Sequence, residues 1–405
     1  MKFRNFLSTA VSALILLSAS ALPVSAEQDI RGCDIAPFGA RLSTYEENIS
    51  IPEAVHVMSI DEAAAVIRNA MKNRVSDFSV VVPKAGFSNS EDAVKKMLAE
   101  AMKETSSGTE GDYLRFALKS YKYDTGENRT AYSLAYKLEY YTTAEQEQET
   151  DRKIAEITSY YSLYDRSKFE IIRAVYDYIS ENVKYAEVEP DESTITDFSI
   201  FTAYGAAVNG TAVCQGYAQL CYRLLKDAGI SCRIISGTSR GIRHTWNIAE
   251  LDGVYYLLDS TWDSILGGSD GVFFMKGSDD FDELSDEIKH IPVYEYETIF
   301  SDYESEAFKA EYPLSAKKAA FPVYTTGDVD GNSIIDGRDA SAVLNAYAIA
   351  SVGRAYPFCR DQMKASDVTG DGTTDGKDAS DILAFYAASS AGKADDIRDF
   401  LKNRT

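Results

Sequence analysis

The sequence predicts an α+β protein of several domains. Helical and extended stretches alternate over residues 27–142, a helix is followed by a hairpin of strands between residues 203 and 263, and two similar acidic segments follow each other near the C-terminus. The chain has 405 residues, of which 45% are hydrophobic, so it is long enough to form two or three domains with cores of their own.

Residues 1–26 have the pattern of an export signal. Lys2 and Arg4 precede an apolar run from Phe6 to Leu22, and small residues follow at the expected cleavage site. We therefore expect a secreted, extracellular protein. The net charge of −22 at pH 7 argues against nucleic-acid binding, and no second apolar stretch is long enough to predict a membrane span.

The region from residue 27 to 142 is expected to be a mixed α/β region. Residues 59–74 and 89–105 have helical patterns, whereas residues 77–83 and 131–142 have extended ones. We find no motif with a chemical role in this region.

A central domain is expected over residues 143–300. It opens with two predicted helices, residues 142–165 and 166–185, whose many tyrosines favour helix packing over a sugar-stacking platform. Residues 301–322 are charged and contain alanine and proline, which predicts a linker. The last domain would then cover residues 323–405.

Cys214 is predicted to open a helix of the central domain. From this position, apolar and small residues recur at helical spacing, and Gly229 suits the C-terminal end. Unpaired backbone N–H groups and the positive end of the helix dipole favour a thiolate at a helix start. The same amides can hold a developing oxyanion.

A hairpin of strands follows this helix. The segments HTWNIAEL and VYYLLDSTW flank Asp252-Gly253, a two-residue turn that fixes the strand register. The register that results places four side chains on one face: His244, Trp246, Asp259 and Thr261. His244 and Asp259 would be diagonal neighbours, so packing the Cys214 helix on this face would complete a Cys-His-Asp triad.

The blocks AVCQGYA, HTWN and DSTWD together resemble the transglutaminase-like superfamily, which shares its triad arrangement with papain-like peptidases. The resemblance covers about residues 165–275. It implies that Cys214 is the nucleophile, His244 the general base and acid, and Asp259 the orienting carboxylate.

Other residues of the same types are expected to have no chemical role. Trp246 and Trp262 are expected to form walls of the site, and His56 and His290 lie outside the three blocks. The five cysteines, at positions 33, 214, 221, 232 and 359, are too few for a disulfide scaffold. Cys214 and Cys221 would lie about 10 Å apart along one helix, too far for a disulfide, and we assign Cys221 and Cys232 to the core.

Two similar segments, which start at Asp328 and Asp367, are predicted to be calcium loops followed by helices. Oxygen-bearing groups recur at loop positions 1, 3, 5, 7, 9 and 12, and the group at position 7 is a backbone carbonyl. The candidate ligands are Asp328, Asp330, Asn332, Ile334, Asp336 and Asp339 in the first loop and Asp367, Thr369, Asp371, Thr373, Asp375 and Asp378 in the second.

The tandem loops resemble the dockerin module of cellulosome proteins over residues 323–392. The resemblance implies two structural calcium ions, a single helix after each loop, and a cohesin module of a scaffold protein as partner. The pairs Gly337-Arg338 and Gly376-Lys377 would help to choose the cohesin. Two departures are Ser333, where glycine is expected, and Thr369, where an acid or amide is expected.

Together these observations predict a secreted, scaffold-anchored cysteine enzyme that transfers acyl groups on protein substrates through a thioester. Peptidase or amidase activity is favoured, with protein cross-linking next, and no catalytic cofactor is expected. Two other interpretations stay open. One is a non-catalytic protein-binding module, and the other is a polysaccharide-degrading glycoside hydrolase, for which no pair of carboxylates stands out.

Overall fold

The computed structural model describes residues 41–44, 54–187, 195–266, 271–282, 289–292 and 305–403. The expected export signal and Cys33 lie outside these residues. The chain divides into two compact units: residues 1–154 with 175–318, and residues 155–174 with 319–405. Among the described residues, no helix combines the length and the apolar character that a membrane span requires.

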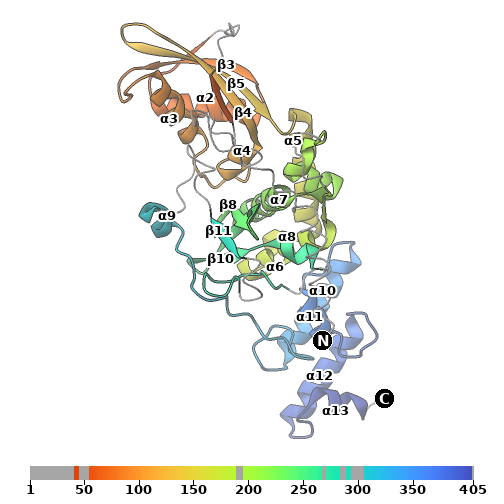
Figure 1. Cartoon of the computed structure of the whole chain (residues 1–405). Coiled ribbons are helices and arrows are strands. Elements are labelled where there is room, and N and C mark those ends of the chain that lie inside the picture. The colour runs from red at the N-terminus through yellow and green to blue at the C-terminus, as the bar shows by residue number, and fades with distance from the viewer. Residues whose placement is uncertain are drawn as a thin grey trace. The chain divides into compact units, whose positions relative to one another are not determined.

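The N-terminal part of the first unit is a five-stranded sheet with helices packed on it. Its strands are β1 Arg41–Thr44, β2 Val55–His56, β3 Asp77–Pro83, β4 Leu118–Glu127 and β5 Ala131–Tyr140, and its helices are α2 Ile60–Lys72, α3 Ser90–Ala101 and α4 Asp112–Ala117. The strands follow the order β1-β4-β5-β3-β2. Helices α2 and α3 lie together on the sheet (Figure 1) and bury their alanine, valine, leucine, isoleucine and methionine side chains against it.

The helices and strands predicted in this region are confirmed: α2, β3, α3 and β5 lie within the expected stretches. Strand β4 was not predicted. A bulge between Leu118 and Ser120 places the two fully buried side chains of this strand, Leu118 and Tyr121, three positions apart. The bulge breaks the two-residue alternation by which a strand is recognised in a sequence.

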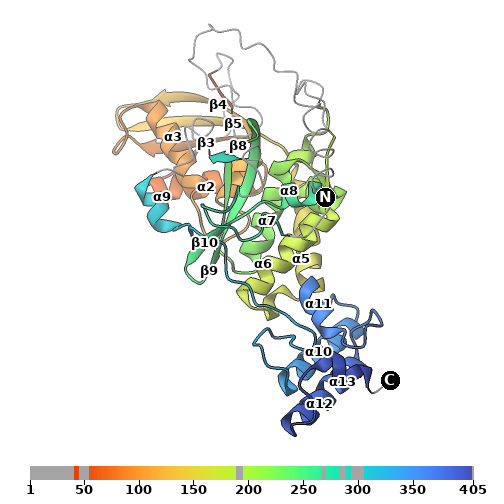
Figure 2. The same ribbon diagram turned by 60° about the horizontal axis from the view of Figure 1, so that its bottom comes forward.

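A four-stranded antiparallel sheet forms the central part of the first unit. Its strands are β8 Cys232–Ser239, β9 Ile242–Leu251, β10 Val254–Leu258 and β11 His290–Pro292, in the order β10-β9-β8-β11. Helix α7, Cys214–Asp227, packs on β8 and β9 (Figure 2). The predicted hairpin is confirmed, because Val254 pairs with Leu251 around a turn in which Asp252 and Gly253 have φ angles of 54° and 87°.

Other elements complete the chain before the C-terminal helices. They are α5 Ala144–Tyr160, η1 Leu163–Asp165, α6 Lys168–Asn182, β6 Lys184–Tyr185, η3 Phe198–Phe201, η4 Gly205–Asn209, β7 Thr211–Ala212, α8 Ser260–Ile265 and α9 Glu306–Glu311. Helices α5 and α6 are the predicted helix pair. Strands β6 and β7 form a separate parallel pair.

The segment that we expected to be a linker is partly folded onto the first unit. After α9, the Pro313 carbonyl accepts a hydrogen bond from the Tyr255 N–H, and the Ser315 N–H donates to the Tyr255 carbonyl, both at 2.8 Å. Residues 313–315 therefore lie beside strand β10 instead of forming part of a free tether.

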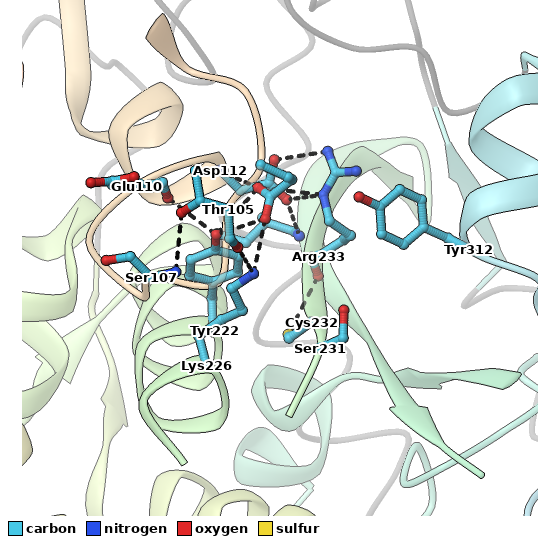
Figure 3. Close-up of polar contacts among 12 residues, drawn as sticks. Thr105, Ser107, Glu110, Asp112, Tyr222, Lys226, Ser231, Cys232, Arg233 and Tyr312 are labelled. Carbon is cyan, nitrogen blue, oxygen red and sulfur yellow. Dashed lines mark hydrogen bonds and ion pairs between the residues drawn. The ribbon is translucent and has the colours of Figure 1, made fainter. Parts of the chain in front are cut away.

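A buried network of charges joins the N-terminal part of this unit to α7 and β8 (Figure 3). Asp112 accepts hydrogen bonds from Arg233 at 2.8 and 3.0 Å and from the Ile234 N–H at 2.7 Å, and its carboxylate lies 2.9 Å from Arg115. Burial alone would raise the pKa of Asp112, but the charges of Arg115 and Arg233 lower it below its usual range. This carboxylate is therefore ionised inside the protein.

Glu104 is the second acid of the network. It accepts hydrogen bonds from the Tyr222 hydroxyl at 2.9 Å and from the Lys226 ammonium at 3.2 Å, and both donors lie on α7. The Arg233 guanidinium also lies 4.6 Å from the centre of the Tyr312 ring, which follows α9. The network thus connects four segments that are far apart in the sequence.

Removal of Asp112 should destabilise the first unit strongly. In Asp112→Ala, two arginines that are almost fully buried lose their carboxylate, which costs about 3 to 5 kcal/mol for a buried pair. Urea unfolding should show this loss as a lower midpoint. Asp77→Ala, which removes an exposed carboxylate from β3, is the matched control and should change stability by at most about 0.5 kcal/mol. Equal effects of the two substitutions would contradict the role given to the network.

The second unit is mainly helical. Besides the end of α5 and the start of α6, its helices are α10 Gly337–Ser351, α11 Arg360–Ser366, α12 Gly376–Ser390 and α13 Ile397–Lys402. Helices α10 and α12 pack against each other around Val343, Ile382 and Phe385. A single helix follows each acidic loop as expected, α10 after the first loop and α12 after the second. Helix α11 precedes the second loop, so this loop is flanked by two helices, which we did not expect.

Candidate active site

Cys214 is the first residue of α7, at the position that the sequence predicts. Val213 before it has an extended backbone. The helix ends at Asp227, Ala228 is its C-cap, and Gly229 follows at a φ of 82°. The Cys214 side chain lies at the positive end of the helix dipole, and the residue is only 4% exposed.

The two residues after Cys214 hold the start of the helix in place. A Cβ atom at Gly216 would lie only 2.8 Å from the carbonyl oxygen of Ile200, so no larger residue fits without a shift of the backbone. The Gln215 amide donates hydrogen bonds to the carbonyls of Phe116 and Phe201 at 3.1 and 2.9 Å. The CQG sequence thus fixes the direction in which α7 begins.

His244 and Asp259 form a buried pair. Nε2 of His244, on β9, lies 2.6 Å from Oδ2 of Asp259, and the two residues are 6% and 1% exposed. The other oxygen of Asp259, Oδ1, accepts hydrogen bonds from the N–H groups of Thr261 and Trp262 at 2.9 and 3.1 Å. Asp259 therefore caps helix α8 and orients His244 with the same carboxylate.

One detail of the predicted hairpin is wrong. Strand β10 ends at Leu258, so Asp259 is not paired with Trp246 in the ladder, and Thr261 lies inside α8. The cap is the physical reason, because backbone amides of the new helix bind the carboxylate at the end of the strand. The contact between His244 and Asp259 exists in spite of this change.

The charges of this pair stabilise each other. Burial alone would lower the pKa of His244, but the charge and hydrogen bond of Asp259, with the hydrogen bond to Cys214, raise it to about 10. Burial would raise the pKa of Asp259, and His244 lowers it below its usual range. Protonated His244 therefore stabilises the fold fully below pH 6.5, its ordinary pKa, and this stabilisation is lost as the pH rises through about 10.

The structure brings Cys214, His244 and Asp259 together. Nε2 of His244 is bound to Asp259, so Nδ1 is the ring nitrogen left for the hydrogen bond with Cys214. The partly buried phenol of Tyr185, on β6, lies near the same groups. Desolvation, and then the charges of Cys214, Tyr217 and Asp259, raise its pKa. Sequence reasoning gave no role to Tyr185, because a single tyrosine in a tyrosine-rich stretch carries no signal.

Two tryptophans lie beside the His244 ring, as the sequence led us to expect. The Trp246 ring is stacked on it with centroids 6.0 Å apart, and the Trp262 ring is tilted against it at 5.9 Å. These rings exclude water from the imidazole, and a lower local dielectric strengthens its interaction with Asp259.

His290 was expected to have no chemical role, yet it contacts the same carboxylate. Its Nε2 lies 3.0 Å from Oδ2 of Asp259, and its Nδ1 lies 2.7 Å from Oδ1 of Asp282. The sequence gave no signal for this contact, since His290 lies on the short edge strand β11, outside the three blocks. His56 lies on β2 and is exposed.

The donor atoms of His244, Asp259 and His290 lie within 4.8 Å of one another, which is close enough to consider a metal ion. The distances favour hydrogen bonds. Two ligands of a tetrahedral zinc ion are about 3.4 Å apart, whereas Nε2 of His244 and Oδ2 of Asp259 are 2.6 Å apart. We therefore derive no metal chemistry at this site.

The remaining described cysteines have no place in this group. Cys221 and Cys232 are buried free thiols, and burial, followed by contact with Cys221, raises the pKa of Cys232. Cys359, in the second unit, is partly exposed and forms no disulfide with another described cysteine.

The first acidic loop gathers its carboxylates as a cation site would. Oxygens of Asp328, Asp330 and Asp339 lie within 4.8 Å of one another. Backbone amides fold the loop around them: Ser333 N–H donates to Asp328 at 2.9 Å, and Val329 N–H donates to Asp339 at 2.7 Å. Three like charges repel each other unless a cation lies between them, so this donor set fits calcium.

The second loop has equivalent hydrogen bonds. Gly372 N–H donates to Asp367 at 2.9 Å, as Ser333 N–H does to Asp328. Thr369 N–H donates to Asp378 at 3.0 Å, as Asp330 N–H does to Asp339 at 3.1 Å. At the position of Gly372, the first loop has Ser333 with a φ of 67°, a conformation that favours glycine. Ser333 therefore stands at a position where glycine would fit the backbone better.

The other expected ligands lie within the two loops. Asn332, Ile334 and Asp336 belong to the first loop, and Asp371, Thr373 and Asp375 to the second. Asp336 and Asp375 cap helices α10 and α12 through their side chains.

Comparison with known proteins places part of the chain in a family. Residues 155–261 match the model of the transglutaminase-like superfamily. The kyphoscoliosis peptidase of Mus musculus is 30% identical over 110 residues, and that of Homo sapiens is 29% identical over 107 residues. Each alignment covers 24% of this chain and 16% of the relative, so the chain spans about a sixth of the length of the curated relatives it matches.

Solved structures give weaker likenesses. A structure of a TGase is 13% identical, with a TM-score of 0.26, over 46% of this chain and 51% of that chain. A proposed cysteine protease from Cytophaga hutchinsonii is 15% identical, with a TM-score of 0.23, over 34% of this chain and 61% of that chain. TM-scores this low do not establish a shared fold.

The residues that match the transglutaminase-like superfamily model include Cys214, His244 and Asp259.

Proposed function

We propose that this protein is a cysteine enzyme that transfers acyl groups from protein substrates, with Cys214 as nucleophile, His244 as general acid and base, and Asp259 as orienting carboxylate. The observation that carries the proposal is the buried hydrogen bond of 2.6 Å between His244 and Asp259, beside a cysteine at a helix start. A protonated imidazole next to a thiol keeps the sulfur as a thiolate, which is the reactive form.

The first half of the reaction forms a thioester. The Cys214 thiolate attacks the carbonyl carbon of a peptide bond or a side-chain carboxamide, and the carbonyl oxygen takes the negative charge. When the tetrahedral intermediate collapses, the C–N bond breaks and His244 gives its proton to the leaving amine or ammonia.

The second half releases the acyl group. Neutral His244 takes a proton from water or an amine, which attacks the thioester, and the thiolate leaves beside the reprotonated imidazole. Water as acceptor gives hydrolysis, and an amine gives a cross-link. We favour hydrolysis by a peptidase or amidase, because the matched mammalian relatives bear the name peptidase, and we rank cross-linking second.

We further propose that the second unit is a calcium-binding, dockerin-like module that attaches a secreted enzyme to a cohesin of a scaffold protein. The gathered carboxylates of the first loop and the repeated hydrogen bonds of the second support calcium. Equivalent apolar side chains on the two repeats are also exposed: Leu344 and Tyr347 on α10, and Leu383 and Tyr386 on α12. A repeated apolar surface of this kind suits a protein partner.

Loss of the thiol should abolish activity. Wild type and Cys214→Ala are incubated with a casein-like protein and a fluorescent amine, and products are separated on gels. New fragments indicate a peptidase, and label on the substrate indicates cross-linking. The variant should show at least a thousandfold lower rate, since removing the nucleophile of a triad costs about that much or more. Cys359→Ala, which removes a partly exposed thiol elsewhere, should leave the rate unchanged.

If wild type gives neither product, the protein-binding module becomes the better interpretation. Equal rates in wild type and Cys214→Ala would remove Cys214 from the mechanism.

The pH dependence of alkylation should reveal the charge on His244. Because the pKa of His244 is raised to about 10, a charged imidazole lies beside Cys214 at pH 6, and iodoacetamide should label Cys214 faster than Cys359 at that pH. In Asp259→Asn the imidazole loses its anionic partner, and labelling at pH 6 should fall at least about tenfold. Mass spectrometry of the labelled peptides measures both rates.

Cys359 in the same chain serves as the internal control, and its labelling should increase with pH in both proteins. Labelling of Cys214 that follows the same pH dependence as Cys359 would argue against an activated nucleophile.

Removal of calcium should destabilise the second unit. Chelation leaves the Asp328, Asp330 and Asp339 carboxylates to repel one another, so the melting temperature of this unit should fall, and added calcium should restore it. Calorimetry of the full chain measures the effect. Asp339→Asn should reduce the effect of calcium on the melting temperature. Asp361→Asn, which changes an exposed residue outside the loops, should leave this effect unchanged. A melting temperature that does not depend on calcium in wild type would remove the assignment.

A further inference from the structure

His290 is held between two carboxylates beside the candidate triad. Its Nε2 lies 3.0 Å from Oδ2 of Asp259, the same oxygen that binds His244. Its Nδ1 lies 2.7 Å from Oδ1 of Asp282, and its backbone N–H donates to Oδ2 of Asp282 at 3.0 Å. Since both ring nitrogens face carboxylate oxygens, only the doubly protonated ring donates to both.

We propose that His290 is a positioning residue for acyl transfer, which holds Oδ2 of Asp259 in line with the His244 ring. The inference rests on the proposed function, because a role for His290 in catalysis requires that Asp259 orient a catalytic histidine. His290 does not touch the sulfur or the reacting carbonyl in this assignment, and it acts through Asp259 alone.

The hydrogen bonds of Asp259 explain why a second histidine matters. Oδ1 is fixed by two backbone amides of α8, whereas Oδ2 is bound by side chains, those of His244 and His290. During the reaction His244 gives up its proton and takes it back. In the neutral state of His244, the N–H of His290 still holds the carboxylate, so the geometry of the pair survives each proton transfer.

The fold is built to bring His290 to this place. His290 lies on β11, which pairs with β8 so that Pro292 is opposite Gly237. A Cβ atom at Gly237 would collide with the backbone carbonyl of Ile291, so glycine is needed for β11 to approach β8. The Phe281 and Trp246 rings then enclose the imidazole, with centroids 4.3 and 5.1 Å away.

The charged and titratable groups that face His290 are few among the described residues. They are Asp259, which precedes α8, Asp282, which precedes β11, and His244 on β9, whose ring centroid lies 5.5 Å from that of His290. Burial alone would raise the pKa of Asp259. The charge and hydrogen bond of His244 lower this pKa more than any other group does, and the hydrogen bond and charge of His290 lower it further. Loss of His290 should therefore let Asp259 take up a proton at a higher pH.

The test measures the rate of iodoacetamide labelling at Cys214 as a function of pH, together with kcat and KM for a casein-like substrate. His290→Phe keeps an aromatic ring in the enclosed space but removes the donor. His290→Gln keeps an N–H donor that can reach Oδ2 of Asp259. EDTA is present throughout, and melting curves confirm that each variant folds.

In His290→Phe, the acid limb of the labelling profile should move up by about one pH unit, and kcat should fall about tenfold while KM stays near the wild-type value. In His290→Gln, the acid limb and kcat should both stay closer to their wild-type values. If His290→Phe does not fold, Asp282→Asn provides the second variant, because it weakens the hold on His290 from outside the triad. Asp282→Asn should move the acid limb of the labelling profile in the same direction as His290→Phe, but by less.

The outcomes separate this inference from the proposed function. Labelling of wild-type Cys214 that follows the pH dependence of Cys359 would overturn the proposed function. Activated wild-type Cys214 with an unchanged profile in His290→Phe would overturn the role of His290 alone. A shift that is equal in the phenylalanine and glutamine variants would also overturn it, because the hydrogen bond would then not be its cause.

Discussion

The hydrogen bond between His244 and Asp259 is the interaction on which the site depends. Both side chains are buried, and an isolated charge in the interior would be neutralised. Together they keep each other ionised, since a short charge-assisted hydrogen bond offsets the cost of burial. In the proposed mechanism, the positive imidazole is what allows a buried thiol at the start of α7 to act as a nucleophile. Without this pair, Cys214 would be one more small side chain in the core.

Several features of the fold serve this one contact. The turn at Asp252-Gly253 sets the register of β9 and β10, and the cap of α8 fixes the Asp259 carboxylate. Asn247, next to Trp246 on β9, donates to the Ala218 carbonyl of α7 at 3.0 Å, which ties the helix to the sheet. Sheet, cap and helix thus meet around a single imidazole, and the expected calcium loops have no part in it.

The sequence predicted the elements that local patterns encode. Helical periodicity located α2, α3 and α7, and the two-residue turn located the hairpin and so the neighbourhood of His244 and Asp259. Contacts between distant segments were missed because no local period records them. His290 comes from an edge strand after a long connection, and Asp112 binds Arg233, 121 residues away. The change from strand to helix at Asp259 was also missed, because a capping aspartate and a strand-end aspartate look alike in a sequence.

The protonation state of the His244 ring tests this account most directly. NMR of the imidazole nitrogens can follow it as a function of pH, because the chain has only three histidines to assign. The account predicts that His244 stays protonated through neutral pH and loses its proton near pH 10, the pKa that Asp259 gives it. Loss of the proton near pH 6.5 in the wild-type protein, the behaviour of an isolated histidine, would contradict the account.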